Sequence, residues 1–280
     1  MKIAMIVGAA LHAVAVLGGI GFWLLGCSLY QPPSLAGSPA AGERVAVSGR
    51  PEVAELSGSR RVGGDLAAAS EFVKGEFRSG GCRITTPLPE GYPAPTPPGA
   101  IELKRYPLVR RAEIGGTMTP DWGMNFAFFP LFNHIKRREI AMTAPVEMNY
   151  QGLEAAGAEK PSSWTMSFVY RTPEQGAAGV DPKDERVRIE DVPPMTVVAV
   201  GMRGPYKMGR MNKGITQLRD WLAQQSDWEA AGEPRTLFYN GPEASSRDLW
   251  SEVQIPVRQV GSAPAGGAGK SNGLTNGRSL

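Results

Sequence analysis

The chain has 280 residues, of which 42% are hydrophobic, and this length and composition suit one or two folded domains. Glycine and proline are unusually frequent, at 35 and 24 residues, so we expect part of the chain to lie outside any compact core. The formal net charge is only +3 and the basic residues are scattered, which argues against a protein that binds nucleic acid by neutralising phosphates.

Residues 1–27 have the character of a membrane-targeting segment. The run from Ile3 to Gly26 carries no charge and is long enough to cross a bilayer as a helix. It ends in LLGC, Leu24 to Cys27, which resembles the lipobox of bacterial lipoproteins, where the cysteine is lipidated and becomes the new N-terminus. A lipidated Cys27 and an uncleaved helical anchor are both open. Either one predicts a membrane-anchored chain whose remainder lies on the outer, extracytoplasmic side.

Two further segments have the composition of unpacked chain. Residues 28–99 are rich in Pro, Gly, Ser and Ala, which predicts a flexible spacer with a possible short helix at residues 65–77. Within it, the stretch from Thr85 to Gly99 is dense in proline and favours an extended conformation. Residues 261–280 are of low complexity and are expected to be disordered. The folded domain is therefore expected to cover residues 100–260.

The cysteines and histidines indicate neither a disulfide nor a zinc site. If Cys27 belongs to the membrane segment, Cys82 has no cysteine left to pair with. No CxxC or HExxH motif and no Cys/His cluster occurs, so we expect no zinc ion held by protein ligands.

The first half of the expected domain predicts strand, helix, strand, strand. Residues 100–114 alternate and are rich in β-forming side chains, which indicates a strand. Residues 121–138 carry apolar side chains at helical spacing, with Asp121 as a possible N-cap and Pro130 as either a kink or the first turn. Residues 140–150 and 163–171 alternate again and indicate two more strands.

The second half repeats this order. Residues 194–204 predict a strand, residues 208–225 an amphipathic helix, and residues 235–240 and 249–257 two strands. We therefore predict an α+β fold in which two duplicated βαββ units form a distorted antiparallel barrel with two flanking helices.

At this point a family resemblance becomes visible. The stretch FFPLFNHIKRREIAMTAPVEM, Phe128 to Met148, resembles the helix and following strand of the SOUL haem-binding proteins. The upstream IELKRYPLVRRAEI and the closing LWSEVQIPV also resemble strands of that family, so the resemblance covers about residues 100–260. It implies a non-enzymatic carrier, buffer or sensor of haem or a related tetrapyrrole, which is a small, hydrophobic and planar ligand.

The resemblance also implies where this ligand would lie. The helix would border an apolar pocket for the flat macrocycle, and aromatic and methionine side chains suit such a ligand. Basic residues at the rim would meet the propionates as charge-assisted pairs. The residues we expect to line this site are Phe128, Leu131, Phe132, His134, Arg137, Met142 and Glu252.

His134 is the only histidine outside the membrane segment, so any imidazole ligand to haem iron must come from it. The alternative, which we favour, is a histidine beside the apolar stripe of the helix with no ligand role. The basic cluster from Lys136 to Arg138 disfavours a protonated imidazole and leaves the ring neutral.

Glu252 supports a second interpretation. The strand end VAVGMRGPY and the segment SEVQIPV are similar to bacterial effector-binding domains of the gyrase-inhibitor type, and Glu252 stands where those domains carry a cleft carboxylate. That resemblance implies effector binding, or hydrolysis of a small molecule, in a cleft. Against hydrolysis, Ser, His and Asp do not group into a nucleophile–base arrangement.

Overall fold

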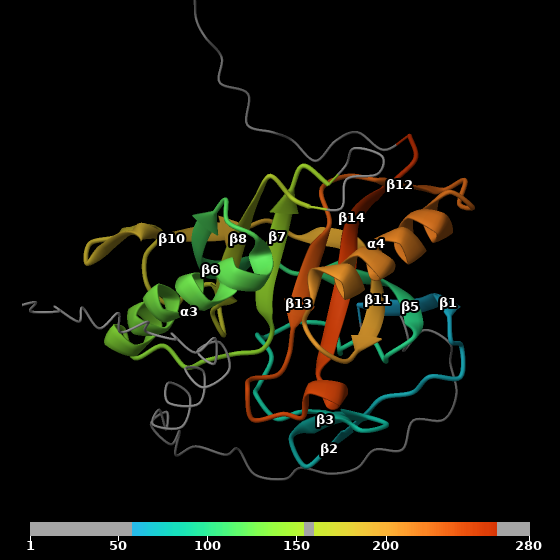
Figure 1. Cartoon of the computed structure of the whole chain (residues 1–280), viewed down its shortest axis with the longest axis horizontal. Coiled ribbons are helices and arrows are strands. Elements are labelled where there is room, and N and C mark those ends of the chain that lie inside the picture. Colours follow the sequence, from blue (N-terminus) through green and yellow to red (C-terminus); the bar gives the residue numbers. More distant parts are fainter. Residues whose placement is uncertain (1–57, 154–159, 262–280) are drawn as a thin grey trace, which may run out of the picture.

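The computed structural model describes residues 58–153 and 160–261, and they form one large antiparallel sheet with two helices on one face (Figure 1). The predicted α+β class is therefore confirmed. The predicted barrel is wrong, because the sheet stays open between two edge strands, β1 (Ser59–Gly64) and β9 (Gly179–Asp181). Among the described residues no helix is long and apolar enough to cross a membrane, and the expected membrane segment and Cys27 lie outside them.

The strand order of the sheet is symmetric about its centre. It runs β1-β5-β11-β14-β13-β7-β8-β6-β10-β9, with β12 paired to β14. At the centre, β7 pairs with β13. On either side of this seam β5 adds to β11 and β10 adds to β6. The bounds of these strands are β5 (Ala100–Tyr106), β6 (Val109–Gly116), β7 (Val146–Gln151), β8 (Ser163–Val169), β10 (Asp184–Val192), β11 (Met195–Arg203), β12 (Trp228–Ala230), β13 (Arg235–Phe238) and β14 (Trp250–Gln259).

The two helices cover one half of the sheet each. Helix α3 (Pro120–Arg137) contacts β6, β8 and β10, and helix α4 (Met208–Leu222) contacts β11, β12 and β14. The N-cap of α3 differs from expectation, because it is Thr119 and not Asp121. The Asp121 carboxylate instead accepts a hydrogen bond from the backbone N–H of Met208, at the start of α4. The two helix N-termini are thereby linked. Pro130 lies inside α3.

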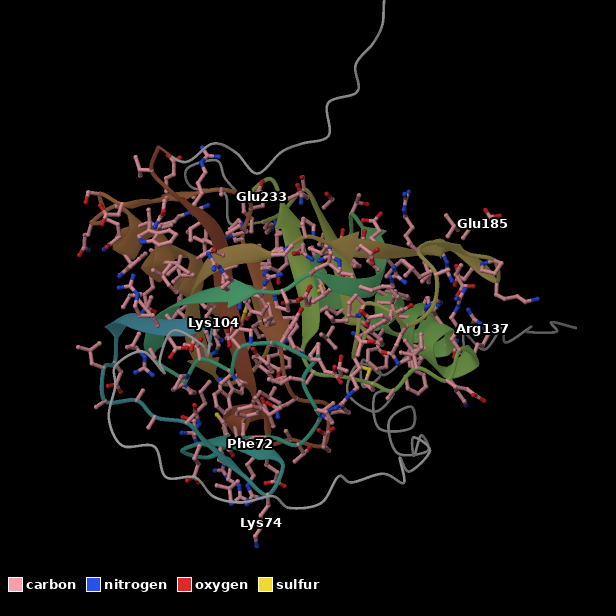
Figure 2. All side chains as sticks on the ribbon, turned by 180° about the vertical axis from the view of Figure 1, so that it is seen from behind. Phe72, Lys74, Lys104, Arg137, Glu185 and Glu233 are labelled. Atoms are coloured by element: carbon pink, nitrogen blue, oxygen red, sulfur yellow. The ribbon has the colours of Figure 1, made fainter. Side chains whose placement is uncertain are left out.

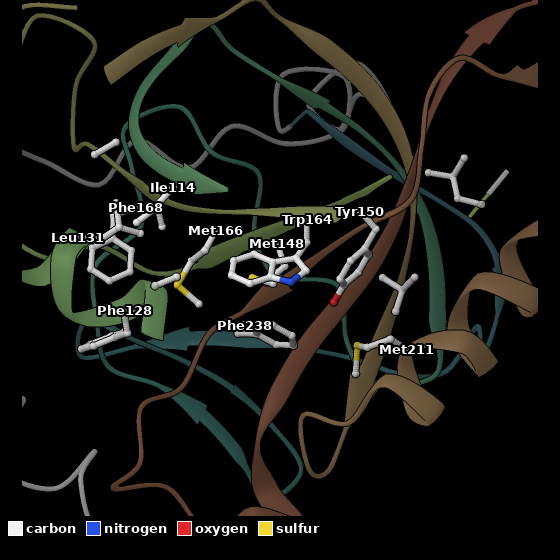
Figure 3. Packing of buried hydrophobic residues seen from close by; sticks show 14 of the residues in the cluster. Ile114, Phe128, Leu131, Met148, Tyr150, Trp164, Met166, Phe168, Met211 and Phe238 are labelled. Carbon is white, nitrogen blue, oxygen red and sulfur yellow. The ribbon is translucent and has the colours of Figure 1, made fainter. Parts of the chain in front are cut away.

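The main core lies between these helices and the sheet (Figure 3). It is rich in aromatic and methionine side chains from the strands and from both helices: Phe128, Tyr150, Trp164, Phe168, Phe238, Met148, Met166 and Met211. Trp164 sits in a slot made by Gly116 and Gly123, where an added Cβ at either glycine would overlap the indole ring. The glycine in the first turns of α3 is thus explained by close packing on β8.

Residues 58–99 differ most from expectation. β1 pairs with β5, and β2 (Glu71–Val73), β3 (Glu76–Ser79) and β4 (Cys82–Ile84) form a small second sheet below the large one (Figure 1). Cys82 and Ile84 are buried, and no helix covers residues 65–77. The described part of the expected spacer is therefore folded. A second cluster of buried side chains, on the other face of the sheet, receives these residues.

We call residues 85–98 the strap. They cross the face of the large sheet opposite the helices with few backbone hydrogen bonds, as a proline-rich segment must. Gly201 makes this path possible, because an added Cβ there would overlap the carbonyl oxygens of Thr96 and Pro97. Composition predicted an unpacked spacer here, whereas the strap packs against the sheet.

Candidate functional site

The side chains expected to line an apolar pocket are mostly core. Phe128 and Leu131 are buried, and Phe128 packs against Phe168 at 5.3 Å between ring centroids and stacks on Phe132 at 5.9 Å. Phe132 and Met142 are half-buried and pack against the same core. All four side chains pack against one another or against the main core, so we looked for a surface for a flat ligand elsewhere on α3.

The outer face of α3 carries a row of side chains that sequence reasoning overlooked. Trp122 and Phe126 are 61% and 65% exposed, and Phe129, Asn133 and Arg137 continue their row. The spacing of four, three, four and four residues puts all five on one line along the helix, opposite the buried face. We call this row the outer stripe. Its helical spacing can be read in the sequence, next to that of the inner apolar stripe.

Along the outer stripe the chemistry changes from aromatic to basic. Trp122, Phe126 and Phe129 span about 10 Å of the helix axis at 1.5 Å per residue. Arg137 closes the stripe two turns further on, and its side chain is 40% exposed. Its guanidinium donates a hydrogen bond to Asp181. An apolar plane with acidic groups at one edge would match this order.

His134 lies beneath the basic end of the stripe and is fully buried. Its Nδ1 contacts Oδ2 of Asp181, and its Nε2 lies 2.6 Å from the hydroxyl of Tyr170. An ionised Asp181 accepts the Nδ1–H, so Nε2 is the nitrogen that accepts the Tyr170 O–H. The same Oδ2 also accepts a hydrogen bond from Arg137 at 2.8 Å. The helix end, the end of β8 and strand β9 are therefore joined by one buried cluster.

The charges in this cluster follow from burial and pairing. Burial lowers the pKa of His134; Asp181 opposes this shift, while Arg138 and Arg137 add to it. Burial alone would raise the pKa of Asp181, but hydrogen bonds from His134, from the Lys183 backbone and from Arg137 lower it to about 2. The expected neutral imidazole thus has burial as its main cause, with the basic cluster second.

This cluster does not fit an iron site. Both ring nitrogens of His134 are engaged, so iron could bind Nε2 only by displacing Tyr170 from a closed position. Within residues 58–153 and 160–261 no three His, Cys, Asp or Glu side chains are grouped to hold a metal ion. The sequence could not have shown the partners of His134, because Tyr170 and Asp181 lie 36 and 47 residues further along the chain.

Glu252 lies on the other face of the sheet, where β14 was expected to turn its polar side. Its Oε1 accepts hydrogen bonds from Lys104 Nζ at 2.7 Å, the Thr96 backbone N–H at 2.7 Å and the Tyr239 hydroxyl at 2.8 Å. Its Oε2 accepts one from the Gln254 amide at 2.6 Å. Glu252 and the Lys104 side chain are both fully buried. The orientation of Glu252 is as expected, but its partner is an internal ammonium group that sequence reasoning did not identify.

The strap closes this polar cluster from outside. Tyr92 donates its hydroxyl to Glu147 at 2.9 Å, and Glu147 lies 3.6 Å from the buried Arg235 guanidinium. Lys104 lies on β5 and is labelled in Figure 2, which is seen from behind. Lys104 therefore occupies the place that a cationic effector would need at Glu252. The geometry gives no support to effector binding or hydrolysis at this carboxylate.

One open pocket lies away from both clusters. It has a volume of about 410 Å³ between the end of α4 and the strands β12 to β14, and its walls include Arg219, Leu222, Pro234 and Arg258. Arg219 donates to the Leu153 carbonyl and Arg258 to Glu229. No residue expected from the sequence lies in it.

Most of the described chain matches a known protein family. The family described as SOUL heme-binding protein matches residues 94–256, more than half of the chain. The chain belongs to the SOUL haem-binding family. The resemblance noted in the helix and the following strand is thereby confirmed, and the SOUL match also begins inside the strap. No curated protein matches the chain.

Several solved structures are similar to this SOUL chain at low identity. They include the EcmrR–DNA complex (17% identity, 57% of each chain, TM-score 0.46) and the EcmrR C-terminal domain (19%, 57% of this chain and 98% of that one, TM-score 0.44). A third is an uncharacterized conserved protein from Listeria innocua (13%, 59% of this chain and 94% of that one, TM-score 0.43). The SOUL chain spans about half the length of the first of these.

Proposed function

We propose that the chain binds haem or a related tetrapyrrole against the outer stripe of α3. Family membership supports a tetrapyrrole as the ligand class. The observation that carries the placement is the order of the outer stripe, in which exposed aromatic rings lead to a basic end at Arg137. A tetrapyrrole has the same order, with a flat apolar macrocycle and propionates on one edge.

The contacts at each end of the stripe are of different kinds. The rings of Trp122 and Phe126 offer polarisable faces and edges to the macrocycle, worth about 0.5–1.5 kcal/mol per aromatic pair beyond the area buried. Arg137 binds a propionate through charge-assisted hydrogen bonds, for which its planar fork is suited. Lys136 is exposed beside it and adds positive charge. These residues bind and orient the ligand, and none of them needs to coordinate a metal.

The proposed role is that of a non-enzymatic carrier, buffer or sensor. Haem would supply its conjugated ring and its propionates to this site, while His134 keeps its contacts with Tyr170 and Asp181. Recognition then depends on the ring and its carboxylates. Metal-free protoporphyrin is therefore expected to bind within a few-fold of haem, since the two share both features.

The test is a pair of titrations of the full-length protein in detergent. Hemin is followed by its Soret band and metal-free protoporphyrin by its fluorescence, and both should saturate near one equivalent. Trp122→Ala and Phe126→Ala should each weaken binding by about two- to tenfold. Because both rings are largely exposed, neither change should lower stability much.

Phe72→Ala is the matched control. Phe72 is 62% exposed, close to the values for the two stripe residues, and it lies on β2, far from Arg137 and the end of α3 (Figure 2). It should leave both affinities unchanged. Equal losses in all three variants, or no saturation by either ligand, would exclude the outer stripe as the site.

We propose that the domain is tethered to the outer side of a membrane through residues 1–27. The uncharged run from Ile3 to Gly26 and the LLGC sequence support this. The test is Cys27→Ser with metabolic labelling by palmitate. A lipoprotein loses the label and the membrane association together, whereas a helical anchor stays in the membrane fraction. A wild-type chain found wholly in the soluble fraction would refute the tether.

We also propose that the SOUL domain is a duplication of two βαββ units. The symmetric strand order about the β7–β13 seam supports this, with one helix over each half. Separate structural superposition of residues 109–169 and 195–259 tests it, and a match no better than that of unrelated α+β fragments would reject it.

A further inference from the structure

Asp181 serves three donors with its two carboxylate oxygens. Its Oδ2 contacts Nδ1 of His134 and also accepts a hydrogen bond from Arg137, while its Oδ1 accepts the Lys183 backbone N–H at 2.8 Å. His134 is fully buried, whereas 40% of the Arg137 side chain is exposed. Of the two donors to Oδ2, Arg137 is thus the outer one, and it belongs to the outer stripe.

The charge of this cluster depends on a single proton. With a neutral His134, the negative Asp181 and the positive Arg137 cancel. With a protonated His134, the cluster carries one net positive charge, and the imidazolium both satisfies Asp181 and repels the guanidinium beside it. The Nε2–H that protonation adds can be accepted by the oxygen of Tyr170, which lies 2.6 Å away.

We propose that Arg137 is a carboxylate-binding side chain held in reserve by Asp181, and that protonation of His134 releases it to the ligand. This rests on the proposed function, since the carboxylate is a propionate of the tetrapyrrole. His134 is a positioning residue here and does not touch the ligand. Binding of the carboxylate and uptake of a proton are then one coupled event.

The pKa values of Tyr170 and Asp181, which contact His134, lie outside the pH range in which histidine changes its charge. Tyr170, at the end of β8, has its pKa raised to about 12 by burial, and Asp181 on β9 has a pKa of about 2. From β6, Arg110 is paired with Asp191. From β10, Asp184 is paired with Arg186, and the guanidinium of Arg138 is near enough to oppose protonation of His134. Between about pH 5 and pH 8, His134 is thus the group in this surrounding that changes charge.

The sign of the coupling follows from the exchange of partners. Once a ligand carboxylate draws Arg137 away, Asp181 loses a positive neighbour and His134 becomes easier to protonate. The bound protein therefore holds its proton more tightly than the free protein, and binding strengthens as the pH falls through that range. The slope cannot exceed about tenfold in affinity per pH unit for one coupled proton.

The binding experiment uses the full-length protein and metal-free protoporphyrin, with its dimethyl ester as the uncharged probe. Protoporphyrin affinity should rise from about pH 8 to about pH 5, and ester affinity should not. His134→Gln and Arg137→Gln should each abolish the rise. Arg138→Gln is the control, because it removes a neighbouring charge that makes no hydrogen bond to Asp181 and should keep the slope. A slope that survives in His134→Gln overturns the proposal.

A second measurement needs no ligand. The chain contains two histidines, so the imidazole NMR signals of His134 are assigned by their loss in His134→Gln. Arg137→Gln should raise the pKa of His134, because the guanidinium no longer opposes protonation. An unchanged His134 pKa would overturn the coupling even if protoporphyrin binds. Failure of both probes to bind at any pH, with the His134 pKa raised as expected, would instead reject the proposed function and keep the charge coupling.

Discussion

Replacing Lys104 by methionine tests whether the polar cluster under the strap stabilises the fold. Methionine matches the length of lysine but removes the ammonium group, 2.7 Å from Glu252, and leaves the carboxylate fully buried. Breaking a buried ion pair from one side costs about 3–5 kcal/mol, because the remaining charge keeps its desolvation penalty. Urea unfolding followed by tryptophan fluorescence measures the loss. A free energy of unfolding within about 1 kcal/mol of wild type would refute the reasoning.

A double-mutant cycle separates the pair from its surroundings. Glu252→Gln removes the charge that Lys104→Met leaves behind, so the loss in the double variant should be smaller than the sum of the two single losses by about 0.5–3 kcal/mol. Arg258→Met provides the control, because the Arg258–Glu229 pair is similarly short, at 2.6 Å, but about 43% exposed. Such a pair is worth about 0–1 kcal/mol.

The pair also predicts a dependence on pH. Burial by itself would raise the pKa of Glu252, but Lys104 and the donors Thr96 and Tyr239 lower it below its ordinary value. Stability from this group is therefore present above the ordinary glutamate pKa and is lost as the pH falls through the lowered one. In Lys104→Met the main cause of the lowering is gone, so this loss should begin at higher pH.

Three further predictions concern α3 and its neighbours. Gly123→Ala should destabilise the fold by about 1–3 kcal/mol through overlap with the indole ring beneath it, whereas Gly209→Ala, which meets no atom within 4 Å, should be neutral or stabilising in the same thermal melts. Phe128→Ala should cost about 3–5 kcal/mol and the half-buried Phe132→Ala less, and equal urea midpoints for the two would contradict the observed burial. Burial lowers the pKa of His134, so stability should decline as the pH falls below the ordinary histidine value of 6.5, and His134→Gln should flatten this decline.

The sequence predicted an element best where its apolar residues recur at a regular spacing and only one of its faces is buried. Helix α3 was predicted at residues 121–138 and spans Pro120–Arg137, because its apolar spacing faces a single sheet. The segment at residues 100–114 was predicted as one strand but forms β5 and β6, interrupted at Pro107 and Leu108. Strands β9 and β10 were not identified, since their charged alternating residues pair at the open edge of the sheet.

The candidate site was less accessible to sequence reasoning, because its defining contacts are distant in the chain. Alternation placed Glu252 on the polar face of β14, but Lys104 lies 148 residues before it and Thr96 lies 156 residues before it. Composition likewise could not show that a proline-rich strap packs against Gly201. The exposure of Trp122 and Phe126, by contrast, could have been inferred from their position opposite the core stripe of α3.

The strap has a practical consequence for recombinant work on this chain. The family match begins at residue 94, and a fragment cut at that point would retain Thr96 but discard Tyr92 together with β1 to β4. Glu147 would lose its phenolic partner, and the buried faces of Tyr106 and Leu237 would meet water. Such a fragment would expose apolar and charged side chains that the intact chain keeps covered. Fragments for crystallisation or NMR should therefore start before Ser59, where β1 begins.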